Sequence, residues 1–305
     1  MIGQHNWMIQ RRRYPAMALL LLAALGPVQA GDVAGPSLQG AGEKLAIHDF
    51  INAEKDFRSA LAAWPAEAPG RERALYGLAL CLWHRTPGTP VLNREAQDLL
   101  AGVVRDFPGS EVAPLAQRSL ARLLEVHDFP GDVIDLAGAR AAYQEVIQRW
   151  PDHPAAAQAG LHLAGAYLRE VADPAALAEG LRLLRVWIAA HPSHELAPVA
   201  WEYLGSASDL LAHDPAAALE AYRAAEALGF VVPSRASVTR WRMAQLAEQT
   251  GQYEVAVDCY RKVIQLTPRG GRAHDAQKAL RRLARENPGL VVDIPAIPGL
   301  AGGAP

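Results

Sequence analysis

One apolar pattern recurs along this chain at regular intervals, and it restricts the fold more than any other feature of the sequence. Each copy has a small residue, a large residue four positions later, and then one or two further apolar residues. Five copies close on a proline eight positions after the large residue, and a sixth has Phe230 there. The large residues are Phe57, Leu100, Tyr143, Leu184, Tyr222 and Tyr260, separated by 43, 43, 41, 38 and 38 residues. Spacing this regular predicts structural repeats.

The pattern within each copy is helical. Residues four positions apart lie on the same face of an α-helix, so the small and large residues form one apolar stripe. Proline then ends the helix, because it lacks the amide donor and forces the preceding residue out of the helical region. A second stretch with its own stripe follows each proline, as Ala113, Ala116 and Leu120 follow Pro108. The sequence therefore predicts an all-α protein of about six antiparallel helix pairs, which bury their stripes by stacking.

Composition excludes several other classes of protein. Hydrophobic residues make up 50% of the 305 residues and charged residues 20%, so the chain is not disordered throughout. Thirty Lys and Arg against 32 Asp and Glu give a formal charge of -2, which argues against a nucleic-acid partner. Two cysteines, Cys81 and Cys259, are too few for a disulfide-rich scaffold. Both lie within apolar helical patterns and are interpreted as buried thiols.

Residues 1–30 have the pattern of a secretory signal peptide. Arg11 to Arg13 are followed by an apolar run over 16–25 and by small residues at Val28 and Ala30. About ten apolar residues are too few to cross a bilayer, which takes roughly 20. We therefore expect a Sec-type signal cleaved after Ala30, leaving an exported, periplasmic chain with a charge of -5 and no transmembrane segment. The alternatives are an uncleaved anchor or a buried first helix. No cysteine near the predicted cleavage site supports a lipid anchor.

The remaining termini are predicted to be irregular. Residues 31–44 are glycine-rich and are interpreted as a flexible linker, which places the helical repeats at 45–286. Residues 287–305 contain several prolines and glycines and are interpreted as a flexible tail. As an alternative, the stretch 290–294 could add to the sheet edge of a partner.

Catalytic, metal-binding and nucleotide-binding motifs are not found. The sequence from His191 to Glu195 does not have the spacing of a zinc-binding H-E-x-x-H motif. Residues 269–272 lack the lysine of a phosphate-binding loop, and no Gly-x-Ser-x-Gly motif occurs. Arg281, Arg282 and Arg285 suggest a solvated last helix, or a surface that contacts acidic polymers or lipid head groups. We therefore expect a non-catalytic protein without a metal or cofactor.

Residues 240–268 resemble the tetratricopeptide repeat (TPR) family. The matching positions, in the order and spacing of the family, are Met243, Ala244, Ala247, Gly251, Tyr253, Ala256, Tyr260, Val263 and Pro268. Arg240 stands where the family has tryptophan, and Trp241 comes one residue late. Residues 107–116 are similar to exported bacterial members of the family, such as the barrel-assembly lipoprotein and the Tol-Pal-associated coordinator. The chain lacks the lipobox cysteine of the first and the N-terminal coiled coil of the second.

The resemblance implies a right-handed α-solenoid of about six TPR-like repeats whose first helices line a concave groove. Candidate groove residues lie on these helices but off the packing stripe. They are Tyr76, Trp83, Arg118, Arg122, His162, Arg169, Glu202, Asp209, Trp241, Gln245 and Glu248. Aromatic residues and arginines in this set are typical of binding hot spots.

Two functions compatible with this groove are considered. The first is an exported scaffold or adaptor that binds a protein or peptide segment, in an outer-membrane or peptidoglycan-associated complex. The second is a module that binds glycan, either peptidoglycan or exopolysaccharide. The glycan function requires aromatic side chains that face the groove, so it depends on whether Trp83 and Trp241 point into the groove or into the core.

Overall fold

A computed structural model describes residues 38–230, 232 and 235–296 of the chain. Thirteen α-helices and no β-strand occur in these residues, which confirms the all-α prediction. The helices are α2 (Leu38–Ala46), α3 (Phe50–Ala63), α4 (Arg71–His84), α5 (Pro90–Asp106), α6 (Ala113–Leu124), α7 (Leu136–Arg149), α8 (Pro154–Leu168), α9 (Pro174–Ala190), α10 (Ala197–Leu210), α11 (Pro215–Leu228), α12 (Ala236–Gln249), α13 (Tyr253–Leu266) and α14 (Gly271–Glu286).

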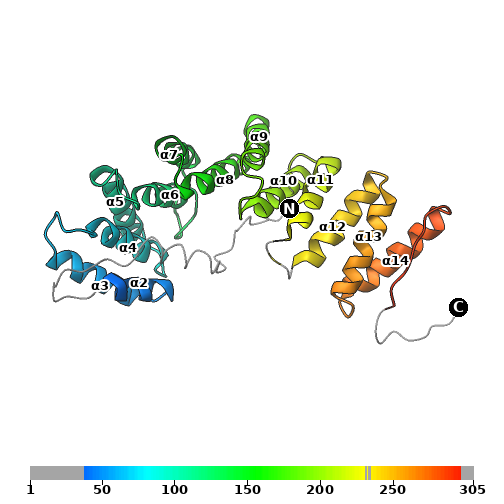
Figure 1. The fold of residues 1–305 in the computed structure, drawn as a ribbon, viewed down its shortest axis with the longest axis horizontal. Helices are drawn as coiled ribbons and strands as arrows, with labels where there is room; N and C mark the ends of the chain where they lie inside the picture. The colour runs from blue at the N-terminus through cyan, green and yellow to red at the C-terminus, as the bar shows by residue number, and fades with distance from the viewer. Residues whose placement is uncertain (1–37, 231, 233–234, 297–305) are drawn as a thin grey trace. The chain divides into compact units, whose positions relative to one another are not determined.

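Helices adjacent in sequence pack against one another, as Figure 1 shows for α4 with α5 and for α12 with α13. We call the even-numbered helices first helices and the odd-numbered ones second helices. The chain divides into two compact units after Ala159, within α8. One hydrophobic cluster fills unit 1 around α3 to α6, and another fills unit 2 around α11 to α14. The fold is a stack of helical repeats of the α-solenoid type.

The repeat predicted from the sequence is confirmed residue by residue. Each of the six large residues lies on a second helix and is buried there. The small residues four positions earlier are equally buried, for example Ala53 before Phe57 and Ala256 before Tyr260. The pairing of a small with a large side chain on one helix face therefore positions every second helix in the stack.

Glycines on the first helices allow the large side chains to approach closely. A Cβ atom added to Gly77 on α4 would overlap the ring of Phe57 on α3. A Cβ atom added to Gly205 on α10 would lie 2.7 Å from Cδ1 of Tyr222 on α11. The aromatic rings thus occupy the space that a side chain would take, and the absence of that side chain sets the distance between neighbouring helices.

Aspartates begin two of the second helices in unit 2, α9 and α11. Asp173 accepts a hydrogen bond from the Ala175 amide at 2.9 Å, and Asp214 accepts one from the Ala217 amide at 3.0 Å. A proline follows each aspartate at the first helical position. This arrangement satisfies an otherwise unpaired amide and starts the helix at a defined residue.

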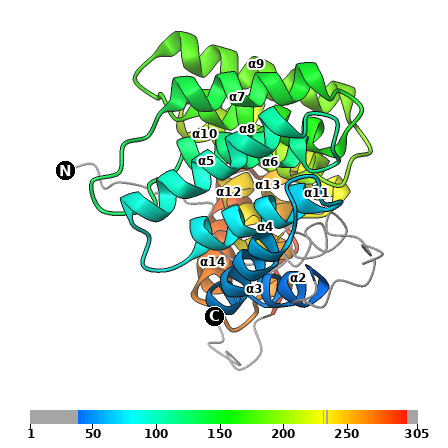
Figure 2. The same cartoon turned by 90° about the vertical axis from the view of Figure 1, so that its left-hand side faces the viewer.

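The predicted linker is wrong over its described part. Residues 38–44 belong to helix α2, while residues 31–37 lie outside the described residues. Leu38, Ala41 and Leu45 form a buried stripe on this helix, which packs against α3 and α4 (Figure 2). The glycine-rich composition hid a short helix, because burial against neighbouring helices offsets the low helix propensity of glycine. Helix α2 is therefore the first helix of the pair whose second helix, α3, contains Phe57.

The predicted flexible tail is also wrong over residues 287–296. Residues 288–289 form a turn, and the residues after it run extended and pack against the cluster of unit 2, with Leu290, Val292 and Ile294 partly buried. The predicted signal peptide and the end of the tail lie outside the described residues. Within the described part of the chain, no helix is long and apolar enough to cross a membrane.

Candidate functional site: the first-helix faces

The predicted groove residues come from successive first helices, as expected. Four belong to unit 1 and the rest to unit 2. Tyr76 and Trp83 lie on α4, Arg118 and Arg122 on α6, His162 on α8, Glu202 and Asp209 on α10, and Trp241, Gln245 and Glu248 on α12, while Arg169 follows the end of α8.

Tyr76 does not line a groove. It is only 2% exposed, and its hydroxyl lies 3.3 Å from Oγ of Ser119 on α6. The helical period places Tyr76 close to the edge of the apolar stripe, and the packing of α6 on α4 covers that edge. Tyr76 therefore joins two first helices of unit 1 and is not available to a ligand.

Trp83 is half-buried and is held by polar and aromatic contacts. Its indole Nε1 donates a hydrogen bond to Asp128 at 2.8 Å. Its ring stacks on His84 with centroids 4.4 Å apart, and it packs against the unit 1 cluster. On the next first helix, Arg118 and Arg122 are both half-buried, and Arg122 pairs with Glu125. On this face of unit 1, the charge of Arg122 is thus already paired with a carboxylate.

In unit 2, an ion pair joins the first helices α10 and α12. Arg242 donates from Nε and Nη2 to the two carboxylate oxygens of Asp209, at 2.7 and 2.5 Å. Its Nη1 also donates to the side-chain oxygen of Gln245, at 3.3 Å. Asp209 is only 7% exposed, so it belongs to the helix interface and does not face a groove. The hydrogen bond to Asp209 raises the pKa of Arg242.

A second ion pair continues the row from α12 to α14. Glu248 accepts a hydrogen bond from the Tyr260 hydroxyl at 2.6 Å and pairs with Arg282, which also contacts Glu286 at 3.0 Å. Burial, together with the hydrogen bond to Glu248, raises the pKa of Tyr260. The hydroxyl therefore stays protonated and acts as a donor. We call the set Asp209, Arg242, Gln245, Glu248 and Arg282 the polar ladder.

Trp241 lies beside the polar ladder and is half-buried. It contacts Tyr260 edge-on, with ring centroids 5.2 Å apart, and packs against the unit 2 cluster. Trp83 is packed against its own cluster in the same way. Each indole therefore offers only part of its surface to a ligand, although the glycan function requires open aromatic faces.

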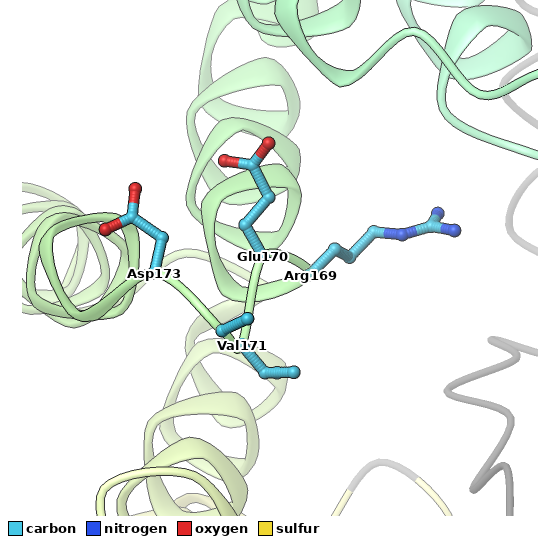
Figure 3. Close-up of a pocket in the computed structure, with 5 residues that line it drawn as sticks. Arg169, Glu170, Val171 and Asp173 are labelled. Atoms are coloured by element: carbon cyan, nitrogen blue, oxygen red, sulfur yellow. The ribbon is translucent and has the colours of Figure 1, made fainter.

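The other predicted groove residues of unit 2 differ in their exposure. His162 and Glu202 are half-buried, and Arg169 is exposed at the turn between α8 and α9. This turn borders an open hollow of about 420 Å³ that is lined by residues 169–173. Figure 3 shows the side chains of Arg169, Glu170 and Asp173 pointing in different directions, so they do not surround a common point.

A second hollow, of about 470 Å³, lies in unit 1 at the ends of the second helices α5 and α7. Val104, Leu120 and Gln117 are among the residues that line it. Gln117 donates a hydrogen bond to Glu145 at 2.6 Å. Arg149 pairs with the same carboxylate. Glu145 thus already has two partners within the hollow.

Among the described residues, no group of three His, Cys, Asp or Glu side chains is placed to hold a metal ion. Cys81 and Cys259 are buried and do not form a disulfide. Burial raises the pKa of each thiol to about 12. Both sulfurs are therefore protonated at neutral pH and behave as small apolar groups, as predicted.

Sequence reasoning missed Arg242, and it assigned Arg282 to a solvated last helix or to a surface that contacts acidic polymers or lipid head groups. Arg242 follows Trp241 directly, and its spacing from Asp209 carries no periodic signal.

The stacked helix pairs define a helical-repeat protein. A family model described as "Tetratricopeptide repeat" matches residues 239–269, which are most of α12 and all of α13. This helix pair is therefore a tetratricopeptide repeat, and proteins built from such repeats generally bind other proteins.

Among solved structures, the chain is similar to one described as "Human IFIT1 dimer with PPP-AAAA". The identity is 14% and the TM-score 0.40, over 81% of this chain. The match spans only 64% of the length of that structure's chain. No curated protein sequence matches the chain.

Proposed function

We propose that this protein is an exported, non-catalytic scaffold that binds a protein or peptide segment on its first-helix faces. The observation that carries the proposal is the polar ladder of unit 2. It fixes three successive first helices to one another through Asp209–Arg242 and Glu248–Arg282. Trp241 and Gln245 lie along the same helices and keep part of their surface open.

A rigid face of this kind favours binding because little has to be ordered when a partner docks. Immobilising one flexible side chain at an interface costs about 0.5–1.5 kcal/mol. In the polar ladder these side chains are already held by hydrogen bonds in the free protein, so this cost does not reduce the affinity. A partner segment then needs only a few contacts, centred on Trp241, to bind specifically.

The binding face is tested by placing a photo-crosslinking amino acid at Trp241 or at Arg118, in cells. We expect both positions to capture the same specific protein. Arg185 is the matched control, because it is exposed on the second helix α9 and lies off the first-helix faces. The proposal fails if Arg185 captures the same protein as efficiently, or if neither first-helix position captures any specific protein.

Export and an envelope role, as in the exported TPR proteins that the sequence resembles, belong to the same proposal. The arginines, the short apolar run and the small residues within 1–30 support export. N-terminal sequencing of protein from the exported fraction should begin at Gly31. Protein that begins at Met1 in that fraction would contradict cleavage.

Glycan binding is the alternative, and the half-buried indoles give it no support. Purified peptidoglycan provides the simplest test. Sedimentation of the protein with peptidoglycan, lost on Trp241→Ala but kept on Arg185→Ala, would favour the glycan function over the scaffold function.

A further inference from the structure

The described part of the tail covers the last helix of the stack. Each earlier first helix is followed by a second helix, but α14 is followed by the extended residues 287–296. Figure 1 shows the chain reversing after α14 and running back along it. The tail thus lies where the other pairs have a helix.

The contact has the alternation of a bound extended peptide. Leu290, Val292 and Ile294 pack against the unit 2 cluster. Between them, Val291 is 89% exposed, and the side chain of Asp293 is 71% exposed. Successive residues of an extended chain point to opposite sides, so one side of the tail faces α13 and α14 and the other faces solvent.

Two polar anchors fix the tail in register. Gln277 of α14, itself largely buried, donates from Nε2 to the carbonyl oxygen of Pro295 at 2.7 Å. Arg261 of α13 donates from Nη2 to Asp293 at 3.0 Å. One anchor contacts the main chain and the other a side chain, which is how extended peptides are commonly recognised.

The tail is held far less firmly than a helix would be. Among the described residues, no hydrogen bond between main-chain atoms involves residues 291–296. Three partly buried side chains and two anchors make up the contact. A competing segment of similar chemistry can therefore replace the tail without unfolding a helix.

We propose that the surface of α13 and α14 beneath residues 290–295 is a second peptide-binding surface, distinct from the first-helix face. This surface binds an extended segment with three aliphatic residues at alternate positions and a carboxylate between the second and the third. In the free protein its own tail fills it, and a partner segment of this chemistry must displace the tail to bind.

The test uses the full chain and a fluorescent peptide with the sequence of residues 287–299. Val292→Asp places a charge on the buried side of the tail and should release it. Val291→Asp, one residue earlier, places the same charge on the exposed side and is the matched control. Fluorescence anisotropy then measures binding of the peptide to each full-length protein.

We expect the peptide to bind Val292→Asp at least tenfold more tightly than it binds Val291→Asp or the wild type. In the wild type and in Val291→Asp, the attached tail competes with the peptide for the surface at an effective concentration on the order of 1 mM. This competition lowers the apparent affinity of the peptide for these two proteins. Adding Gln277→Leu to Val292→Asp should weaken peptide binding about three- to tenfold, through loss of the hydrogen bond to the Pro295 carbonyl.

Asp293→Lys is a second releasing variant, in case Val292→Asp disturbs the helices. It changes an exposed side chain and opposes Arg261, so it should raise peptide affinity while leaving the circular dichroism spectrum unchanged. Equal peptide affinity for both releasing variants and for Val291→Asp, with helicity intact, would overturn the proposal. Tight binding to the wild type would also overturn it, because the tail would then not occupy the surface.

Discussion

At the scale of single residues, the ion pair between Asp209 and Arg242 is the most important for the stability of the first-helix face. The Asp209 side chain is 4% exposed and that of Arg242 is 36% exposed. Removal of the cation therefore leaves a buried carboxylate without a charged partner, which is costly. Removal of an exposed pair costs little, because water solvates the remaining charge.

We predict that Arg242→Ala lowers the free energy of unfolding by about 2 kcal/mol, less than for a fully buried pair because solvent partly screens Arg242. Urea denaturation measures this change. Arg182→Ala is the matched control: its pair with Glu179 on α9 is exposed, and the loss should stay below about 0.5 kcal/mol. Equal losses would mean that the ladder does not stabilise the first-helix face.

His153 provides a second prediction at this scale, because it caps the start of α8. Its Nδ1 accepts a hydrogen bond from the Ala155 amide at 3.0 Å, which requires a neutral ring. Burial lowers the pKa of His153 from its ordinary value of 6.5, and Arg118 lowers it further, against the opposing charge of Glu111. The neutral ring thus stabilises the fold above pH 6.5, and this stabilisation is lost as the pH falls through the lowered pKa.

Between pH 7.5 and 5, the wild type should lose about 1 kcal/mol of stability relative to His153→Asn, the usual contribution of a helix cap. Asparagine keeps an acceptor at this position but does not titrate, and the other histidines contribute equally to both proteins. Thermal or urea unfolding at several pH values measures the difference. Parallel stability profiles for the two proteins would contradict a capping role.

At the scale of helices, glycine determines how closely neighbouring helices can approach each other. Gly77 faces the ring of Phe57, whereas the nearest atoms to an added Cβ at Gly102 on α5 are side-chain atoms 3.8 Å or more away. Alanine normally stabilises a helix relative to glycine by about 0.5–1 kcal/mol. The two glycines should therefore respond to the same substitution with opposite signs.

We predict that Gly77→Ala destabilises the protein by about 1–3 kcal/mol, the usual cost of overpacking, because the ring of Phe57 must move. Gly102→Ala should be neutral or stabilising. Circular dichroism during urea unfolding gives both values. If Gly77→Ala were as stable as Gly102→Ala, the close contact of Gly77 with Phe57 would not determine the packing of α4 on α3.

At the scale of the whole molecule, stacked repeats contact mainly their neighbours, so local damage should stay local. Leu280 on α14 and Leu100 on α5 are both fully buried, one in each unit. Leu-to-Ala substitution at such sites costs about 2–5 kcal/mol. A single cooperative core would spread this loss over the entire chain.

We predict that Leu280→Ala speeds hydrogen exchange of the α12–α14 amides and leaves α3–α5 unchanged. Leu100→Ala should produce the converse pattern. Hydrogen-exchange mass spectrometry of both variants resolves the helices. An equal rise in exchange along the whole chain, in either variant, would show that the two units unfold together.

The sequence by itself determined the repeat, the second helices and the buried stripe on each of them. The stripe of Ala256 and Tyr260 was readable because it repeats every few residues along one helix, and such a periodicity is local. The same reasoning placed the closing prolines, whose effects reach only one turn of a helix.

Tertiary structure decided which polar side chains meet. Asp209 and Arg242 are 33 residues apart, and only the packing of α10 on α12 brings them together. In unit 1, the contact of α4 with α6 buried Tyr76, which was predicted to line the groove. Likewise, α2 and the tail over 290–295 were predicted to be flexible, because weak local preferences conceal segments that gain their order from burial. Helix formation is a local property of this chain, whereas the pairing of charges and the ordering of its ends depend on neighbouring helices.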